Sequence, residues 1–324
     1  MYKFLISSLL VALSSCKSDE GKEPELINIT NFNVIIAPDL SNRINPVIHP
    51  KPVHDTIIIN RIYNDIPKFI KSGGRTTQQK DIFTLDFINT GILNDLNFNQ
   101  NSVKIDFGQF EKRQTDRSDY IRSKLKNDII VAKKNVKAIY ENSLKNPHGS
   151  DIYNYLNSTI NNVLVSEEVS MHKVSEYIEA EVSTKNILIL ITDGYIENST
   201  TGSGYQFTES TIQKIRKDFI NKKEKDLNAF IAENSQFQIN PLTNKNLNEC
   251  KIIVVEMIDR SLDSNGVAKQ YPTDFDIMRS VWEQWFEQSN ISDFQFVKAQ
   301  NTPEQVLSQI TKFITKHSSN KKHL

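Results

Sequence analysis

Oxygen-bearing side chains follow two apolar runs of the sequence, at the points where these runs end. Residues 33–38 are mostly apolar and are followed by Asp39 and Ser41, and residues 187–191 are followed closely by Asp193. Apolar runs of this length, bounded by turn formers, are typical of strands that are buried on both faces of a parallel sheet. The carboxyl ends of such strands meet at one edge of the sheet, where ligands are usually held. We therefore expect these oxygens to gather at a single site.

A third stretch brings a further hydroxyl, because Ser150 stands in a turn that leads into a predicted helix. In this order the three stretches resemble the von Willebrand factor type A (vWA) domain with its metal-ion-dependent adhesion site. The family has Asp-x-Ser-x-Ser after the first strand, Thr before a helix and Asp-Gly after the fourth strand. Asp39 and Ser41 match the first motif, Ser150 stands in place of the Thr, and Asp193 matches the last.

This resemblance implies a site for Mg²⁺ or another divalent cation. Hard cations of this kind take oxygen ligands and tolerate water among them. By analogy with the family, Ser41 and Ser150 would bind the ion directly, and Asp39 and Asp193 would bind it directly or through water. Acids that merely cap turns are the alternative interpretation of the two carboxylates.

Arg43 stands where the family has its second serine. A unit charge and a divalent ion about 5 Å apart repel by roughly 7 kcal/mol at an effective dielectric of about 20. The guanidinium therefore either points away from a bound ion, where it would receive an acidic group from a partner, or replaces the ion and pairs with Asp39 or Asp193. Both alternatives remain open at this stage.

The N-terminal segment predicts export and a lipid anchor. Lys3 precedes about ten apolar residues, and small residues stand directly before Cys16. This arrangement is typical of a secretory signal and is too short for a membrane span, which needs about 20 residues. It resembles the lipobox of bacterial lipoproteins, which implies cleavage after residue 15 and lipidation of Cys16. We expect a signal peptide over 1–15, a lipidated, flexible tether over 16–30 and a single vWA-like domain over 31–320, in the bacterial cell envelope.

Composition narrows the classes of partner. Lys and Arg together number 39, as do Asp and Glu, so the formal net charge is zero. A nucleic-acid-binding protein would favour a basic surface, and we therefore expect no nucleic-acid partner. Besides Cys16 the chain has only Cys250, which begins an apolar run and is expected to be a buried, inert thiol rather than half of an internal disulfide.

The order of the remaining patterns predicts the fold class. Strand patterns alternate with amphipathic patterns, which indicates an α/β protein with helices on both faces of its sheet. We expect a doubly wound, mainly parallel sheet of about six strands. The first expected strand ends at residue 38. The others are expected to cover 81–88, 103–110, 186–191, 252–257 and 294–297. The expected helices cover 54–70, 112–146, a segment that starts at 150 or 151, 211–234, 275–288 and 303–316.

The function implied by the resemblance is binding without catalysis. The chain would be a membrane-anchored adhesion lipoprotein that engages a protein or extracellular ligand at the carboxyl edge of the sheet. One alternative is a phosphoryl hydrolase that uses Asp39 as its nucleophile, although Ser41 stands where the second acid of one such family would be. The other is a structural component of an envelope complex with an inactive metal site.

Overall fold

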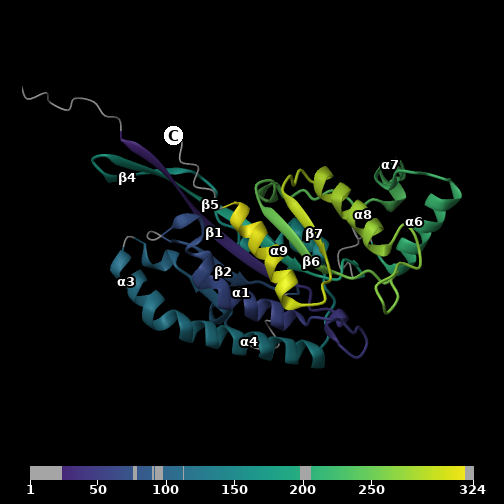
Figure 1. Ribbon diagram of the computed structural model, residues 1–324, viewed down its shortest axis with the longest axis horizontal. Coiled ribbons are helices and arrows are strands. Elements are labelled where there is room, and N and C mark those ends of the chain that lie inside the picture. Colours follow the sequence, from purple (N-terminus) through teal and green to yellow (C-terminus); the bar gives the residue numbers. More distant parts are fainter. Residues whose placement is uncertain are drawn as a thin grey trace, which may run out of the picture.

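The fold is a doubly wound α/β fold built on one mostly parallel sheet (Figure 1). A computed structural model describes residues 24–75, 79–89, 91, 98–111, 113–197 and 206–317. The strands are β1 (Glu25–Pro38), β2 (Ile82–Leu85), β3 (Lys104–Asp106), β4 (Ser170–Ser175), β5 (Ile178–Ile191), β6 (Lys251–Met257) and β7 (Phe294–Lys298). Among the described residues the sheet order is β3-β2-β1-β5-β6-β7, with β4 paired to β5. The predicted fold class is confirmed.

Helices cover both faces of the sheet. They are α1 (Asp55–Phe69), α3 (Gln114–Asp119), α4 (Leu125–Lys145), α5 (Ile152–Asn157), α6 (Glu209–Asn221), α7 (Leu227–Glu233), α8 (Asp274–Gln288) and α9 (Pro303–Lys316). Alternate residues of the central strands point to opposite faces, as the period of a strand requires. Ile36 and Ile189 pack into the core formed with α1, α4 and α9. Leu188 and Leu190 pack into the core formed with α5 to α8.

Hydrogen-bonded register explains how distant residues come to one edge. β1 and β5 are parallel neighbours, and Pro38 pairs with Ile191 at their carboxyl ends. The backbone N–H of Asp39 donates to the carbonyl of Ile191 at 2.9 Å, which continues the ladder by one residue. Asp39 and Asp193 therefore leave adjacent strands at the same edge, 154 positions apart in the sequence.

Several elements differ from the expected ones. β3 is antiparallel to β2 and forms one edge of the otherwise mostly parallel sheet. The helix expected over 112–146 is interrupted by a π-helical turn, Tyr120–Lys124, which separates α3 from α4. The helix expected over 211–234 is two helices, α6 and α7.

The sheet also extends further than expected at the amino ends of its two central strands. β1 begins at Glu25, inside the segment expected to be a tether, and β5 begins at Ile178 rather than at 186. The two strands pair over their whole length, and β4 adds to β5 outside the body of the sheet. The amino-terminal parts of β1 and β5, together with β4, project from the molecule (Figure 1).

The expected signal peptide, and with it Cys16, lies outside the described residues. Within the part of the chain that the structure describes, every helix is too short or too polar to cross a membrane. Cys250 is a buried free thiol whose pKa burial raises to about 12, in agreement with an inert structural role.

Candidate functional site

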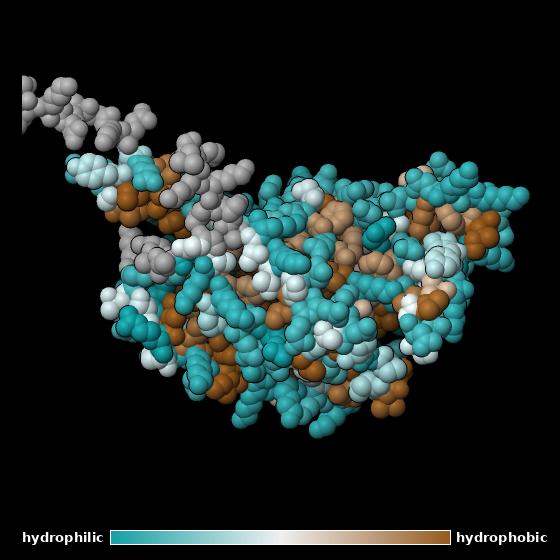
Figure 2. Space-filling view, viewed as in Figure 1, coloured by the Kyte–Doolittle hydropathy of each residue, from teal (hydrophilic) through white to brown (hydrophobic). Residues whose placement is uncertain are grey.

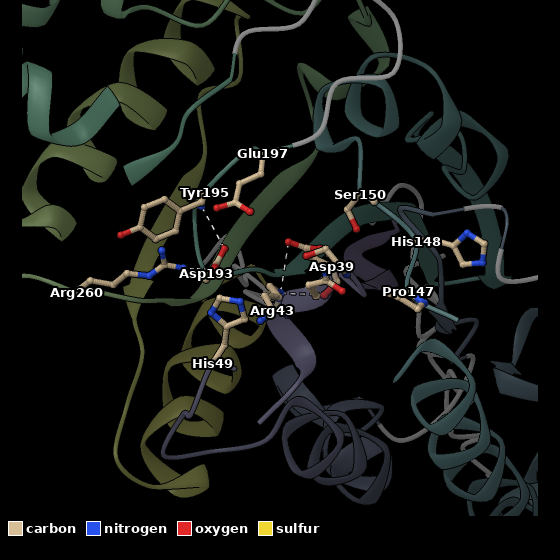
Figure 3. A pocket seen from close by; sticks show the side chains of 13 residues that line it. Asp39, Arg43, His49, Pro147, His148, Ser150, Asp193, Tyr195, Glu197 and Arg260 are labelled. Atoms are coloured by element: carbon tan, nitrogen blue, oxygen red, sulfur yellow. Dashed lines mark hydrogen bonds and ion pairs between the residues drawn. The ribbon is translucent and has the colours of Figure 1, made fainter. Parts of the chain in front are cut away.

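The four residues singled out by the sequence line a single cavity. Asp39, Ser41, Ser150 and Asp193 contribute to a cavity of about 280 Å³ at the carboxyl edge of the sheet (Figure 3). Three connections meet there: the one after β1, the one before α5 and the one after β5. The sequence prediction that these side chains gather at one end of the sheet agrees with the structure.

Asp39 is buried and its carboxylate is already bonded within the chain. The backbone N–H of Ser41 donates to Oδ1 at 3.0 Å, and the hydroxyl of Thr192 donates to Oδ2 at 3.0 Å. The first bond tightens the turn that follows β1, and the second ties that turn to the end of β5. Asp39 therefore joins the two central strands at the edge of the sheet.

Arg43 lies in a short 3-10 turn (Asn42–Ile44) and points into the protein. Its Nε donates to the carbonyl of Asp39 at 2.9 Å and lies 3.4 Å from Oδ2 of the same residue. Its Nη2 donates to the carbonyl of Ile191 at 2.7 Å and to Oδ2 of Asp55 at 2.6 Å. Burial alone would lower the pKa of Arg43, but the nearby carboxylates of Asp55 and Asp39 outweigh it and raise that pKa above its ordinary value. The guanidinium is thus a fixed positive charge.

Asp55 is the main partner of Arg43 and was not predicted from the sequence. It is the first residue of α1, is fully buried, and also accepts a bond from Nζ of Lys51 at 2.7 Å. Burial would raise the pKa of Asp55, but Arg43 and Lys51 hold it below its ordinary range. The expected pairing of Arg43 with Asp39 is present, whereas the pairing with Asp193 is replaced by this second ion pair.

Asp193 is paired with a different arginine, Arg260. Nη2 of Arg260 lies 3.3 Å from Oδ2 of Asp193, and the backbone N–H of Tyr195 donates to Oδ1 at 3.3 Å. Burial raises the pKa of Asp193 to about 6, with Arg43 acting in the opposite direction. Gly194 has a φ of +90°, and a Cβ there would lie 2.8 Å from the sulfur of Met278, so the turn requires glycine.

Ser150 presents a free hydroxyl to the cavity. The residue is 6% exposed, its Oγ has no hydrogen-bond partner among the described residues, and the side chain points toward Asp39 (Figure 3). The next residue, Asp151, is the cap of α5, because its Oδ1 accepts from the backbone N–H of Asn154 at 2.9 Å. Ser150 is therefore not needed to cap the helix, and its hydroxyl is not committed to the helix end.

The donor set does not fit a divalent cation as it stands. The carboxylate of Asp39 is bonded to Ser41 and Thr192 and lies beside Arg43, whose guanidinium is fixed by Asp55. At about 5 Å that guanidinium would repel a divalent ion by roughly 7 kcal/mol at an effective dielectric of about 20. Of the two alternatives that the sequence left open, the arrangement agrees with the one in which Arg43 takes the place of the ion.

Among the other residues that line the cavity, Tyr195, Glu197 and Arg260 were not singled out as site residues by sequence reasoning. The guanidinium of Arg260 lies 4.1 Å from the centre of the Tyr195 ring and also pairs with Glu209 at 3.3 Å. Arg260 comes three residues after the strand expected over 252–257. Its closeness to the carboxyl end of a strand was the signal in the sequence that could have identified it as a site residue. His49 and His148 also line the cavity.

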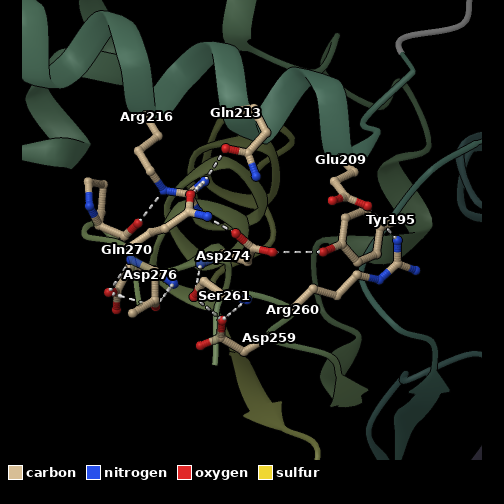
Figure 4. Close-up of polar contacts among 12 residues, drawn as sticks. Tyr195, Glu209, Gln213, Arg216, Asp259, Arg260, Ser261, Gln270, Asp274 and Asp276 are labelled. Carbon is tan, nitrogen blue, oxygen red and sulfur yellow. Dashed lines mark hydrogen bonds and ion pairs between the residues drawn. The ribbon is translucent and has the colours of Figure 1, made fainter. Parts of the chain in front are cut away.

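A second polar cluster contacts Tyr195, which with Glu197 and Arg260 forms the rim of the cavity (Figure 4). The hydroxyl of Tyr195 donates to Oδ2 of Asp274 at 3.3 Å, and Nη2 of Arg216 donates to Oδ1 of the same carboxylate. Arg216 comes from α6 and Asp274 is the first residue of α8, so the cluster joins two helices to the rim. Nε of Arg216 also donates to the carbonyl of Pro272 at 2.8 Å.

Comparisons with known proteins add no family to this description. A scan against protein-family models found no match to the chain. A search of curated proteins found no significantly similar sequence.

Proposed function

We propose that this chain is a vWA-like binding module, anchored to a membrane of the bacterial cell envelope by a lipid on Cys16. It engages a protein or extracellular ligand at the carboxyl edge of the sheet and carries out no catalysis. The site works without a divalent cation, because Arg43 holds the positive charge that the ion would supply.

The observation that carries this proposal is the shared cavity. Asp39, Ser41, Ser150 and Asp193 come from three connections and line one hollow, in the order that the resemblance requires. The buried hydroxyl of Ser150, which no described residue bonds, suggests that the hollow is suited to a ligand with polar groups. The bonds that Asp39 makes with Thr192 and Ser41 suit a carboxylate that shapes the site rather than one that attacks a substrate.

Photo-cross-linking from the rim of the cavity tests the binding role. A photoreactive amino acid replaces Glu197, which is exposed at the rim, and in a matched control it replaces Glu233, which is exposed on α7. We expect a cross-linked product from the rim that is absent from the control and is lost when Ser150→Phe fills the cavity. Identical products from both positions, or none from the rim, would favour a purely structural component.

The same experiment separates the metal-free site from a metal-dependent one. We expect the rim product to persist when a chelator removes divalent ions, because Arg43 is part of the folded chain. Loss of the product on chelation, with recovery on addition of Mg²⁺, would contradict a metal-free site while leaving the binding role intact.

The anchor is tested at the mature N-terminus. Mass spectrometry should find Cys16 as the first residue and should find it acylated, since two or more acyl chains hold a protein stably on a membrane. An unmodified Cys16, or a chain that still begins at Met1, would contradict this part of the proposal.

A further inference from the structure

The amino ends of β1 and β5 extend beyond the sheet that they organise. β1 pairs with β2 only from Asn33 onward, and β5 pairs with β6 only from Ile187 onward. We call residues 25–31 and 170–184, which include β4, the arm. It projects at one end of the molecule, while α7 lies at the other (Figure 1).

The arm exposes large apolar side chains close together. Leu26, Met171, Val174 and Tyr177 are between 49% and 68% exposed, and Val169 directly before β4 is 57% exposed. Figure 2 shows apolar surface gathered on this projection. Single exposed apolar residues are ordinary, but a cluster on one projecting element marks an interaction surface.

The arm is acidic although the whole chain is neutral. It contains the glutamates Glu25, Glu176, Glu179 and Glu181, and its one lysine or arginine is Lys173, while the formal net charge of the chain is zero. Lys173 lies opposite Glu179 in the β4–β5 register, so its charge is offset locally. This imbalance favours a partner that carries positive charge.

One edge of β4 is open within the described part of the chain. β4 pairs with β5 along one side, and no described strand pairs with its other side. A free edge presents backbone N–H and C=O groups that can pair with another strand. Beside it lies a cavity of about 310 Å³, lined by the apolar residues Ile29, Val174, Ala180 and Val182 together with Lys80, Glu111, His172 and Lys173.

We propose that the arm is a docking surface for an extended, basic segment of a protein partner, which adds to β4 as an extra strand. Backbone pairing at the free edge would supply affinity, and alternate side chains would supply specificity. The register shift between Lys173 and Ser175 ends the regular edge, so the docked segment is short. A second copy of this chain is disfavoured because two acidic arms would repel, and an anionic membrane surface is disfavoured for the same reason.

The test uses a short labelled peptide of alternating lysine and valine, whose binding to the full-length chain is followed by fluorescence anisotropy. A peptide of alternating glutamate and valine tests charge. A lysine–valine peptide with alternate backbone nitrogens methylated keeps the charge and removes half of the amide donors. The variant Glu168→Lys with Glu176→Lys changes two exposed residues that flank β4, and Glu224→Lys with Glu233→Lys makes the same charge change on exposed residues elsewhere.

We expect the lysine–valine peptide to bind, and the glutamate–valine and methylated peptides to bind at least about tenfold more weakly, which corresponds to about 1.4 kcal/mol. The arm variant should weaken binding by a similar factor, and the control variant should leave it within about twofold. Equal binding of the methylated peptide would overturn strand addition, and equal effects of the two variants would overturn the arm as the site. Binding to anionic vesicles or self-association that the arm variant abolishes, with no peptide binding, would assign the surface to another occupant and overturn the proposal.

The cavity at the carboxyl edge is not involved in this inference. The arm lies at the opposite ends of β1 and β5, so a failure of peptide binding leaves the rim cross-link unaffected.

Discussion

The two ends of β1 and β5 place their charges in opposite ways. At the carboxyl ends Asp39 and Asp193 are buried, and each lies beside an arginine: Arg43, four residues after Asp39, and Arg260, which is distant from Asp193 in the sequence. At the amino ends the glutamates of the arm stand on strands that reach into solvent, and one lysine is interspersed among them. Buried charges must be compensated within the chain because desolvation is costly. Exposed charges are stabilised by water, so they need no counter-charge within the chain and can pair with a partner.

This difference also separates what each end can recognise. The cavity is lined by polar groups, and the guanidinium of Arg43 is held there by four acceptors. These are the carbonyl and carboxylate of Asp39, the carbonyl of Ile191 and the carboxylate of Asp55. A ligand there has to fit groups that are already arranged. The arm instead offers a strand edge, which accepts many sequences of suitable charge.

The largest effect on stability is expected from removing the guanidinium of Arg43. Arg43→Met leaves Asp55 and Asp39 buried without their main counter-charge and should lower the free energy of unfolding by about 3–5 kcal/mol. Arg260→Met is the matched control, because Arg260 is 26% exposed and its pair with Asp193 should contribute about 1 kcal/mol or less. Urea unfolding measures both. Equal small losses would show that burial does not distinguish the two arginines.

Metal binding should appear when the positive charge is removed. The melting temperature of the wild-type chain should not change with Mg²⁺ or Mn²⁺, whereas Arg43→Ser, which restores the hydroxyl of the family, should bind these ions at least about tenfold more tightly. Arg43→Lys retains the charge and should not gain affinity. Calorimetry decides the matter, and equal metal affinity in the serine and lysine variants would show that charge at position 43 does not exclude the ion.

A smaller effect is expected from Asp193 and depends on pH. Because burial raises its pKa from 3.8 to about 6, the folded state favours the protonated carboxyl. Its contribution to stability is therefore present below pH 3.8 and is lost as the pH rises through 6. Asp193→Asn should be more stable than the wild type by about 3 kcal/mol at pH 8, because the pKa of Asp193 rises from 3.8 to about 6 on folding, and the difference should vanish below pH 3.8. A less stable variant at pH 8 would mean that the pair with Arg260 outweighs burial.

The smallest effect on stability is expected at the arm. Glu168→Lys with Glu176→Lys should change the free energy of unfolding by less than about 0.5 kcal/mol, since both residues are exposed. Urea unfolding of this variant beside Arg43→Met completes the comparison between the two ends. A loss of several kcal/mol at the arm would show that its charges support the fold itself.

Local patterns in the sequence were sufficient for the site's framework. The apolar runs before Asp39 and Asp193 predict buried parallel strands, and such strands place their carboxyl ends at one edge. The cap before α5 and the Asp-Gly turn after β5 are also local signals, since each depends on residues within three positions. The fold class and the gathering of Asp39, Ser41 and Asp193 follow from patterns of this kind, whereas Ser150 was assigned to the site through the resemblance to the vWA domain.

Tertiary structure decided the features that depend on distant partners. Nothing near Arg43 in the sequence selects Asp55 over Asp193, because the choice depends on how α1 packs beside the carboxyl ends of β1 and β5. The arm has the same origin: residues 25–31 alternate weakly and suit a tether, and they form a strand because residues 178–184 pair with them. Strand pairing is a long-range hydrogen-bonded contact, so a short segment acquires its structure only when the second strand is in place beside it.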